Sequence, residues 1–257
     1  MGEKLDLRNP VTYTQKIQWL KLHNTNPIYT KMVDKYEARE IVKNILGEGY
    51  LIPLLGKWDK YEEIDFHLLP LKFVLKTTHD SGTTIICHDK NLFDYHSAKK
   101  KLTKALKRNY FYLSREYPYK NIVPKIIAEE FIQESENGYL ADYKFFCFNG
   151  IPELLLIVTN EKDKKYNNFF DINFNPLELS TGFEFSPYEI DKPENYDHMV
   201  EIAKRLSSGI PHVRIDLYNI HGMVYFGEFT FHHSGGLIQF SDIMWNKWLG
   251  DIIMLDQ

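Results

Sequence analysis

Charged side chains recur at strand spacing near the end of the 257-residue chain, in the segment HVRIDLYNIHGMVYFGEFT at residues 212–230. Apolar and polar residues alternate over its first seven positions, which is the period of a half-buried strand. We expect residues 220–222 to form a three-residue loop with Gly222 at a positive-φ position, so that Asn219 pairs with Met223. The segment is therefore predicted to be a β-hairpin.

This hairpin register predicts that two carboxylates converge. Counting back from the loop, Arg214 faces Glu228, and Asp216 faces Phe226. Asp216 and Glu228 then become diagonal neighbours on one face, about 7–8 Å apart at the backbone. Two carboxylates with an arginine between them form a site for a hard cation such as Mg²⁺. A plain ion pair between Arg214 and Glu228 explains the same residues, and the hairpin alone slightly favours that interpretation.

Small polar residues form a second candidate site at positions 79–84, HDSGTT. Residues 71–86 are predicted to form a strand, a loop and a returning strand, with this segment at the tip. Backbone amides and hydroxyls in such a loop can surround phosphate oxygens. Lys76, on the incoming strand, would point a cation at the same place. An ordinary hairpin loop is the alternative, because a single glycine is weak support for a phosphate site.

Two further segments carry residue types that bind metals or anions. His232 and His233 are adjacent, but no third ligand is spaced to help them, so contact with substrate or with a neighbouring group is the better interpretation. A helix predicted over residues 95–108 contains five lysines and Arg108. Such runs are usually solvated helix faces, and the binding of an anionic polymer is the weaker alternative.

Composition is that of an ordinary globular protein with one large or two small domains, with 44% hydrophobic and 26% charged residues. A net charge of −4 argues against a nucleic-acid partner. Cys87 and Cys147 lie in apolar runs and are expected to be free thiols in a reducing compartment. The N-terminus lacks an apolar signal region, and no apolar run reaches the roughly 20 residues that span a bilayer. We therefore expect a cytoplasmic protein without a membrane span.

The remaining segments predict the elements that must position these side chains. A short helix follows Thr12 or Thr14, and Asp34 with Glu37 forms a capping box for a second helix that ends at Gly47. Further along the chain we expect a buried strand over residues 125–132, a hairpin over 142–158 with its turn at 149–150, and a helix over 191–208.

Taken in order, these segments resemble the ATP-grasp superfamily, and more closely its TupA-like family from bacterial surface-polymer gene clusters. The phrases that carry the resemblance are NPVTYTQKIQWLKL, YTKMVDKYEAREIV, YLIPLLG, FVLKTTHDSG, IIAEEF, DYKFFCFNG and VRIDLYNIHGMVYFGEFTF. The resemblance extends over nearly the whole chain, about residues 8–250. No P-loop or GxGxxG motif competes with them.

The resemblance implies an α+β ATP-grasp fold, in which two α+β subdomains clamp a nucleotide and a helical segment precedes them. Residues 1–70 would be the N-terminal helical segment, packed on the core. Residues 71–140 would form the small subdomain, with the phosphate loop and the hinge strand. Residues 141–257 would form the C-terminal subdomain, with the metal and substrate side.

The resemblance also assigns roles in nucleotide binding. Lys35 and Lys76 are similar to the two phosphate-contacting lysines, and Asp142, or with less support Glu134, is similar to the ribose-binding acid. The loop that covers the triphosphate would comprise Ser81, Gly82, Thr83 and Thr84. The hinge strand beside adenine would contribute Glu129, Phe131 and Ile132, with Glu129 accepting a hydrogen bond from the adenine amino group.

Catalytic and metal-binding roles follow from the same resemblance. Asp216 and Glu228 match the magnesium carboxylates, and Arg214 matches the arginine that steadies the transferred charge. Lys144 would reach ATP or the substrate. The superfamily usually has an asparagine two residues after the second acid, where this chain has Thr230, a weaker metal ligand. That departure bears on the geometry of the second metal ion.

The activity implied is that of an ATP- and Mg²⁺-dependent carboxylate–amine ligase, with two metal ions expected. It would form an acyl phosphate and then an amide, release ADP and phosphate, and modify a bacterial surface polysaccharide or its precursor. The partners expected are a small-molecule or glycan carboxylate and an amine. Alternatives are an ATP-dependent carbohydrate kinase, a glycosyltransferase of a capsule or O-antigen cluster, and a non-catalytic nucleotide- or glycan-binding module. The sequence does not indicate an oligomeric state.

Overall fold

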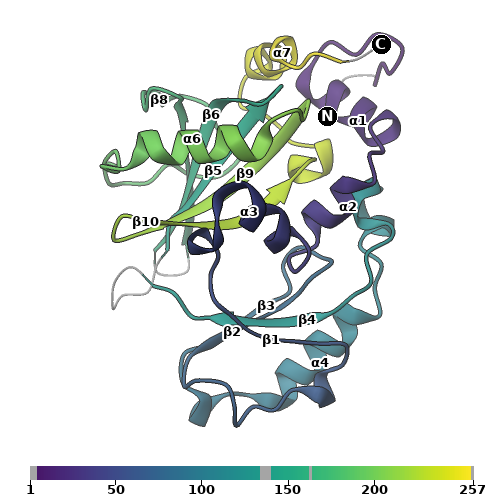
Figure 1. Ribbon diagram of the computed structural model, residues 1–257. Helices are drawn as coiled ribbons and strands as arrows, with labels where there is room; N and C mark the ends of the chain where they lie inside the picture. Colours follow the sequence, from purple (N-terminus) through teal and green to yellow (C-terminus); the bar gives the residue numbers. More distant parts are fainter. Residues whose placement is uncertain (1–4, 134–139, 162–163, 256–257) are drawn as a thin grey trace. The chain divides into compact units, whose positions relative to one another are not determined.

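The computed structural model describes residues 5–133, 140–161 and 164–255 (Figure 1). The chain divides into two compact units. The first comprises Met1–Thr25, Ile45–Tyr50 and Gln133–Gln257, and the second comprises Asn26–Asn44 and Leu51–Ile132. The first contains a six-stranded sheet and the second a four-stranded sheet, and every pairing within each sheet is antiparallel. The predicted α+β fold class is confirmed.

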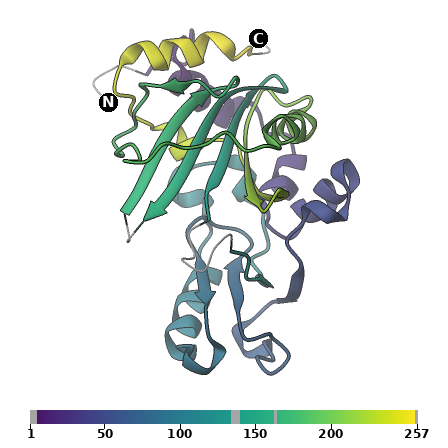
Figure 2. The same cartoon turned by 90° about the vertical axis from the view of Figure 1, so that its left-hand side faces the viewer.

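The sheet of the first unit has the strand order β10-β9-β5-β6-β7-β8. Its strands are β5 (Asp142–Phe148), β6 (Ile151–Glu161), β7 (Lys164–Asp171), β8 (Pro176–Leu177), β9 (His212–Ile220) and β10 (Met223–Thr230). Its helices are α1 (Tyr13–His23), α6 (Tyr196–Ser207) and α7 (Ile243–Ile252). Figure 2 shows these strands side by side, with the green α6 against one face. The hairpin expected over residues 142–158 is present as β5 and β6, and its turn lies at residues 149–150 as predicted.

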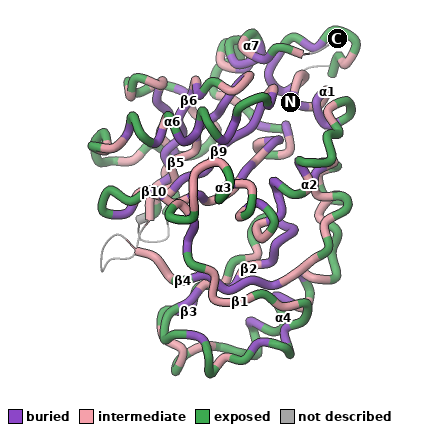
Figure 3. The backbone as a smooth tube through the Cα atoms, in the orientation of Figure 1, coloured by how far each residue is buried: buried purple, intermediate pink, exposed green. Residues whose placement is uncertain are grey.

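Both faces of the sheet in the first unit are covered at the end of β5. Phe146 and Phe148 pack into a cluster with α1 and α7, whereas Phe145 contacts Tyr196 of α6. Because both faces are covered, the sequence at the end of the strand is the unbroken apolar run FFCF and does not alternate between apolar and polar residues. Buried residues accordingly extend along most of β9 as well (Figure 3).

Helix α1 begins at the predicted cap. The Thr12 hydroxyl accepts a hydrogen bond from the Gln15 amide, and the Gln15 side chain accepts one from the Thr12 amide. Thr14 is instead joined to Asn246 of α7 by two hydrogen bonds of 3.0 Å. Gly250 of α7 lies so close to the chain before α1 that a Cβ there would meet the Val11 carbonyl oxygen at 2.3 Å. The two helices therefore pack as one layer against the sheet.

The sheet of the second unit has the order β1-β4-β2-β3. Its strands are β1 (Leu54–Trp58), β2 (Phe73–Thr77), β3 (Thr84–Cys87) and β4 (Ile126–Glu130). The α-helices that accompany this sheet are α2 (Ile28–Val33), α3 (Ala38–Leu46), α4 (Tyr95–Leu106) and α5 (Phe111–Ser114). Phe73 and Leu75 pack with Leu102 of α4. Side chains alternate along a strand, so Lys76 lies on the face of the sheet opposite α4.

The register of the β9–β10 hairpin differs from the prediction. Met223 pairs with Ile220 rather than with Asn219, because His221 and Gly222 form a two-residue turn in which both take positive φ, 50° and 81°. A bulge at residue 227 then shifts the register once more. Asp216 consequently lies directly opposite Glu228, and the predicted diagonal arrangement is wrong.

The two cysteines are free and buried, as predicted. Burial raises the pKa of the Cys147 thiol to about 12. Within the described parts of the chain, no helix has the length and apolar character needed to cross a bilayer.

His212, at the start of β9, joins the sheet to α1. Its Nδ1 lies 2.9 Å from the Cys147 carbonyl oxygen, and its Nε2 lies 3.1 Å from the Tyr13 hydroxyl. A neutral imidazole with its proton on Nδ1 satisfies both contacts, by donating to the carbonyl and accepting from the hydroxyl. Burial lowers the pKa of His212 to about 3, because the charged form would lose its hydration.

We expect this histidine to make the folded protein acid-sensitive. Its pKa in the unfolded chain is about 6.5. Below about pH 6.5 the unfolded state therefore binds a proton that the native state does not bind. The contribution is fully present above about pH 6.5 and is lost at about 1.4 kcal/mol per pH unit as the pH falls toward 3. Thermal unfolding at a series of pH values checks this: His212→Phe should be less stable overall but show a flatter decline between pH 6 and 4. Equal slopes for the two proteins would contradict the assignment.

Candidate active site

A row of charged side chains crosses three strands of the first unit. Lys144 of β5 pairs with Asp216 of β9, and Asp216 pairs with Glu228 of β10. Cross-strand partners face the same side of a sheet, so the three side chains share one face. The Lys144 ammonium lies 2.5 Å from Asp216 Oδ2 and 3.2 Å from Asp142 Oδ2. The register alone therefore brings together four residues that were expected to act on ATP, metal or substrate.

Arg214 organises this row. Its Nε and Nη2 atoms donate to the two Asp216 oxygens at 2.6 and 2.7 Å, which is a bidentate pair. Nη2 also lies 3.2 Å from Glu228 Oε1 and 3.0 Å from Thr230 Oγ1. Thr230 in turn donates to Glu228 at 2.8 Å. The Arg214–Glu228 ion pair weighed from the sequence is thus present, but it is the longest of the contacts that Arg214 makes with these acids.

Burial divides the two carboxylates into different roles. Asp216 is 3% exposed, whereas the Glu228 side chain is 39% exposed. Desolvation alone would raise the pKa of Asp216, but the positive charges of Arg214 and Lys144 hold that pKa below its usual value. Desolvation would likewise lower the pKa of Lys144, and Asp216 nevertheless holds it above its usual value. At neutral pH Asp216 and Lys144 are therefore both ionised.

Asp142 behaves differently from Asp216. Burial raises the pKa of the Asp142 carboxyl, and the nearby Lys144 ammonium only partly offsets that effect. Asp216 and Glu228, with their like charge, push in the same direction as burial. A carboxylate of raised pKa is a stronger proton acceptor than an ordinary aspartate, and such residues are common among catalytic bases. Glu134, the alternative ribose-binding acid, lies outside the described residues.

His233 supports the arginine. Its Nδ1 accepts a hydrogen bond from Arg214 Nη1. Burial lowers the pKa of His233 well below its usual value, and the positive charge of Arg214 acts in the same direction. The ring is therefore neutral and able to accept a hydrogen bond.

Within residues 5–133, 140–161 and 164–255, no group of three or more His, Cys, Asp or Glu side chains could hold a metal ion by itself.

Two residues of β7 join this face and were not predicted from the sequence. Asn167 pairs with Val158 of β6, which pairs with Asp142, so these three share one row across the sheet. Asn167 is 6% exposed, and its Oδ1 has no hydrogen-bond partner among the described residues. Burial lowers the pKa of Lys165, and the Lys144 ammonium lowers it further. The segment KKYNNFFD lacks a clear period, so the sequence did not assign these residues to a face.

The second unit holds the cations expected to contact phosphate. Lys76 Nζ lies 2.6 Å from Glu129 Oε2, and Arg39 Nη1 lies 3.1 Å from Glu129 Oε1. Glu129, expected to meet the adenine amino group, is thus paired with two cations. Phe131 and Ile132 directly follow β4 and are half-buried, as a segment that lines a ligand would be.

The loop at residues 80–84 is held from within. Both Asp80 carboxylate oxygens accept hydrogen bonds, one from Thr77 Oγ1 at 2.5 Å and one from Thr83 Oγ1 at 2.6 Å. Gly82 adopts a φ of 88°, which favours glycine. Lys35 donates from its ammonium to the Asp80 carbonyl oxygen and from its amide to the Thr78 carbonyl oxygen. Lys35 is therefore fixed at the base of the predicted phosphate loop.

Together, the two antiparallel sheets and these two sets of charged residues define an α+β protein with a carboxylate–arginine–lysine site on one sheet and a lysine-bearing loop on the other. The model of the TupA-like ATP-grasp family matches residues 15–254. The chain belongs to that family, as the sequence resemblance indicated.

Solved structures of low identity also match. They include D-alanine–D-alanine ligase from Bacillus anthracis complexed with ATP, at 15% identity and a TM-score of 0.46, over 86% of this chain and 63% of that one. ATP-grasp ligase PsnB with a minimal precursor matches at 13% identity and 0.43, over 85% and 59%. Biotin carboxylase from Campylobacter jejuni matches at 12% identity and 0.49, over 95% and 53%. The chain spans less than two thirds of each of these proteins. A search of curated proteins gave no match.

Proposed function

We propose that this chain is an ATP- and Mg²⁺-dependent ligase that joins a carboxylate to an amine. Family membership supports ATP as the substrate. The observation that carries the proposal is the row of Lys144, Asp216 and Glu228 on three adjacent strands, in which Arg214 donates hydrogen bonds to both acids. Phosphoryl transfer requires positioning and charge neutralisation more than covalent chemistry, and such a row is suited to both.

The carboxylate donors fit a magnesium ion. Mg²⁺ in nucleotide enzymes is usually held by one or two carboxylates together with phosphate oxygens and water. Asp216 and Glu228 supply two carboxylates that directly oppose each other, and Thr230 adds a hydroxyl beside Glu228. Two ions, as the family resemblance implies, would share these ligands. When bound there, magnesium would supply positive charge beside the transferring phosphoryl group.

The other residues of this row would act on the transferring phosphoryl group. Arg214 keeps its proton, and Asp216 and His233 fix its guanidinium group by hydrogen bonds. It therefore offers a fixed positive charge to the transition state. Lys144 would balance the charge of the acceptor carboxylate as it attacks the γ-phosphate and displaces ADP. Asp142 would accept the proton that the amine loses when it attacks the acyl phosphate and releases phosphate.

The nucleotide would be held by residues of the second unit. Lys76 and Lys35 would contact its phosphates, and residues 81–84 would cover them and exclude water from the acyl phosphate. Glu129, Phe131 and Ile132 would line the adenine. The Lys76 ammonium lies 2.6 Å from Glu129 in this structure. In this proposal a phosphate oxygen replaces Glu129 as its partner when the nucleotide binds.

A kinase is the second candidate, because the same side chains could serve that reaction as well. A carboxylate of raised pKa can take the proton from a hydroxyl as readily as from an amine. Phosphoryl transfer to a sugar hydroxyl would use the same metal, arginine and lysines. The products therefore decide between the two reactions.

We expect incubation with ATP, Mg²⁺, uronic acids and amino acids to release ADP and to give an amide whose mass is the sum of the two reactants minus water. Mass spectrometry with ADP detection makes this measurement. A product heavier than one sugar by a phosphoryl group would establish the kinase instead. AMP, or UDP released from a nucleotide sugar, would contradict both proposals. A glycan carboxylate of a bacterial surface polysaccharide is the acceptor we propose, and the same panel tests it.

A further inference from the structure

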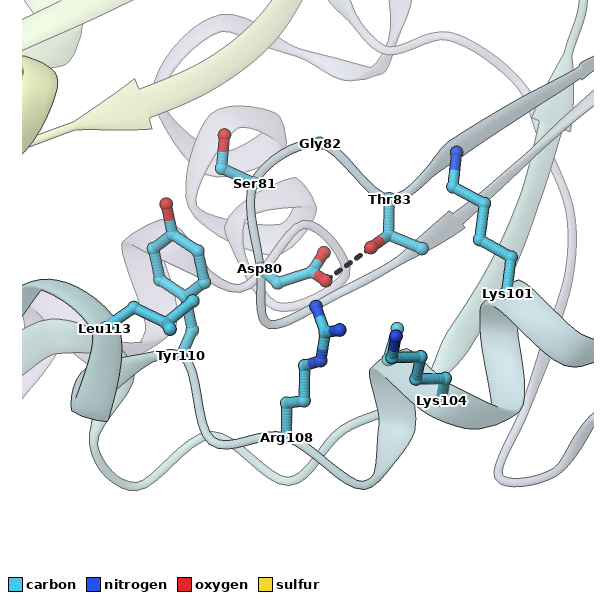
Figure 4. Close-up of a pocket in the computed structure, with 10 residues that line it drawn as sticks. Asp80, Ser81, Gly82, Thr83, Lys101, Lys104, Arg108, Tyr110 and Leu113 are labelled. Carbon is cyan, nitrogen blue, oxygen red and sulfur yellow. Dashed lines mark hydrogen bonds between the residues drawn. The ribbon is translucent and has the colours of Figure 1, made fainter.

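A cavity of about 300 Å³ lies within the second unit, between the loop at residues 80–83 and the last turns of α4 (Figure 4). This volume is at the lower end of the range for small-molecule sites. The loop lines one side, and Lys101, Lys104 and Arg108 line another, with Tyr110 and Leu113 completing the wall. In Figure 4 the Arg108 side chain extends toward the Asp80 carboxylate.

The charge of this cavity is positive. Three cations line it against one carboxylate, that of Asp80. Both Asp80 oxygens already accept hydrogen bonds from threonine hydroxyls, so they are not available as free acceptors for a bound cation. Among the described residues, Lys104 and Arg108 form no ion pair with any carboxylate. The chain as a whole is acidic, with a net charge of −4, so this concentration of positive charge is local.

The cavity shares residues 81–83 with the loop proposed to cover the nucleotide, but its cations lie on the other face of the sheet from Lys76. Leu75 and Leu102 pack together between β2 and α4, so α4 covers one face of the sheet. Lys76 and Glu129 pair on the opposite face. The cavity therefore reaches the phosphate loop from the α4 side, whereas Lys76 approaches it from the other side of the sheet.

We propose that this cavity binds an anion of the phosphate class, either free phosphate or the phosphate group of a small phosphorylated metabolite. Arg108 and Lys104 would each donate charge-assisted hydrogen bonds to its oxygens. Lys101 is directed toward the loop, because its ammonium donates to the Thr84 carbonyl oxygen at 2.9 Å.

The simplest competing explanation is that these cations only complement the negative end of the helix dipole at the end of α4. That role would be shared by Lys107, which caps the helix. Lys107 lines a neighbouring hollow together with Lys104 and Arg108, but it does not line the cavity beside the loop. Lys107 is therefore a matched control of the same charge on the same turn.

The test is calorimetric titration of the full chain with inorganic phosphate and, separately, with glucose 1-phosphate. We expect Arg108→Ala and Lys104→Ala each to weaken binding of one of these anions about ten-fold or more, and Lys107→Ala to change it less than two-fold. Tighter binding of glucose 1-phosphate would identify a phosphorylated metabolite as the ligand, and equal or tighter binding of phosphate would identify the free ion. The three substituted side chains are exposed, so the variants should remain folded, which circular dichroism verifies.

Three results would overturn the proposal. Equal losses in all three variants would show diffuse attraction to a basic helix rather than a site. Competition between phosphate and a non-hydrolysable ATP analogue, with loss of phosphate binding in Lys76→Ala, would show that the ion occupies the nucleotide site. The absence of any measurable binding at millimolar phosphate would leave the dipole explanation standing, and equal stability losses in Lys104→Ala and Lys107→Ala would support it.

Discussion

Glu228→Gln should lose about 10²- to 10³-fold in ATP- and Mg²⁺-dependent ADP release while its thermal unfolding stays close to that of the original protein. The amide keeps the size of the side chain and can still accept hydrogen bonds from Arg214 and Thr230 through its oxygen. It removes the negative charge that we propose binds magnesium. Because the Glu228 side chain is 39% exposed, little desolvation energy is at stake, and the loss should be one of activity rather than of folding.

Glu201→Gln on α6 is the matched control, because it makes the same change of charge at an exposed position of the same unit. It should retain full activity. Asp216→Asn is a poorer test, because it leaves Arg214 and Lys144 buried with one fewer counter-charge. Removing one partner of such a buried group typically costs about 3–5 kcal/mol. A fully active Glu228→Gln protein would refute the metal assignment.

Lys76→Ala should weaken the binding of a non-hydrolysable ATP analogue about 10- to 100-fold. A hydrogen bond to a charged group contributes about 1.5–3 kcal/mol, and each 1.4 kcal/mol is ten-fold in affinity. The lysine lies on the face of its sheet opposite α4, and in this structure its ammonium donates to Glu129 Oε2 at 2.6 Å. A phosphate oxygen would replace that carboxylate in the complex. Calorimetry in the presence of Mg²⁺ measures the affinity.

Lys99→Ala is the control for this second variant, because Lys99 is exposed on α4 and pairs with the exposed Glu62. It should bind the analogue as the original protein does. Arg39 remains on Glu129 after the substitution, so the carboxylate keeps a counter-charge and the sheet should stay folded. Unchanged affinity in the Lys76 variant would reject its role at the phosphates.

The charged residues of the candidate site could be predicted from the sequence, because their types and their spacing along a strand are visible in it. Arg214, Asp216 and Glu228 alternate with apolar residues, and the hairpin follows from that period and from the turn. Their relative placement could not be predicted. The two-residue turn and the bulge at residue 227 each move the register by a single position, and no periodic pattern encodes either of them.

The parts of the fold that were missed share a physical cause, which is that their context is tertiary. Strand β1 (Leu54–Trp58) has no alternation of its own and forms by pairing with β4. Strand β7 became a strand through its eight-residue pairing with β6, and this pairing places Lys165 and Asn167 on the face of the candidate site. When a residue's neighbours lie on another strand, the sequence around that residue does not indicate which face of the sheet it occupies.

The central proposal is that Asp216 and Glu228 bind the magnesium ion that accompanies ATP and that Lys76 binds a phosphate of the nucleotide. Crystals grown with a non-hydrolysable ATP analogue and Mn²⁺ in place of Mg²⁺ would test this directly through the anomalous signal of manganese. We predict a manganese peak about 2.1 Å from carboxylate oxygens of Asp216 and Glu228, with the Lys76 ammonium in contact with a phosphate oxygen. A peak on other residues, or a nucleotide bound without contact to these three side chains, would contradict the account.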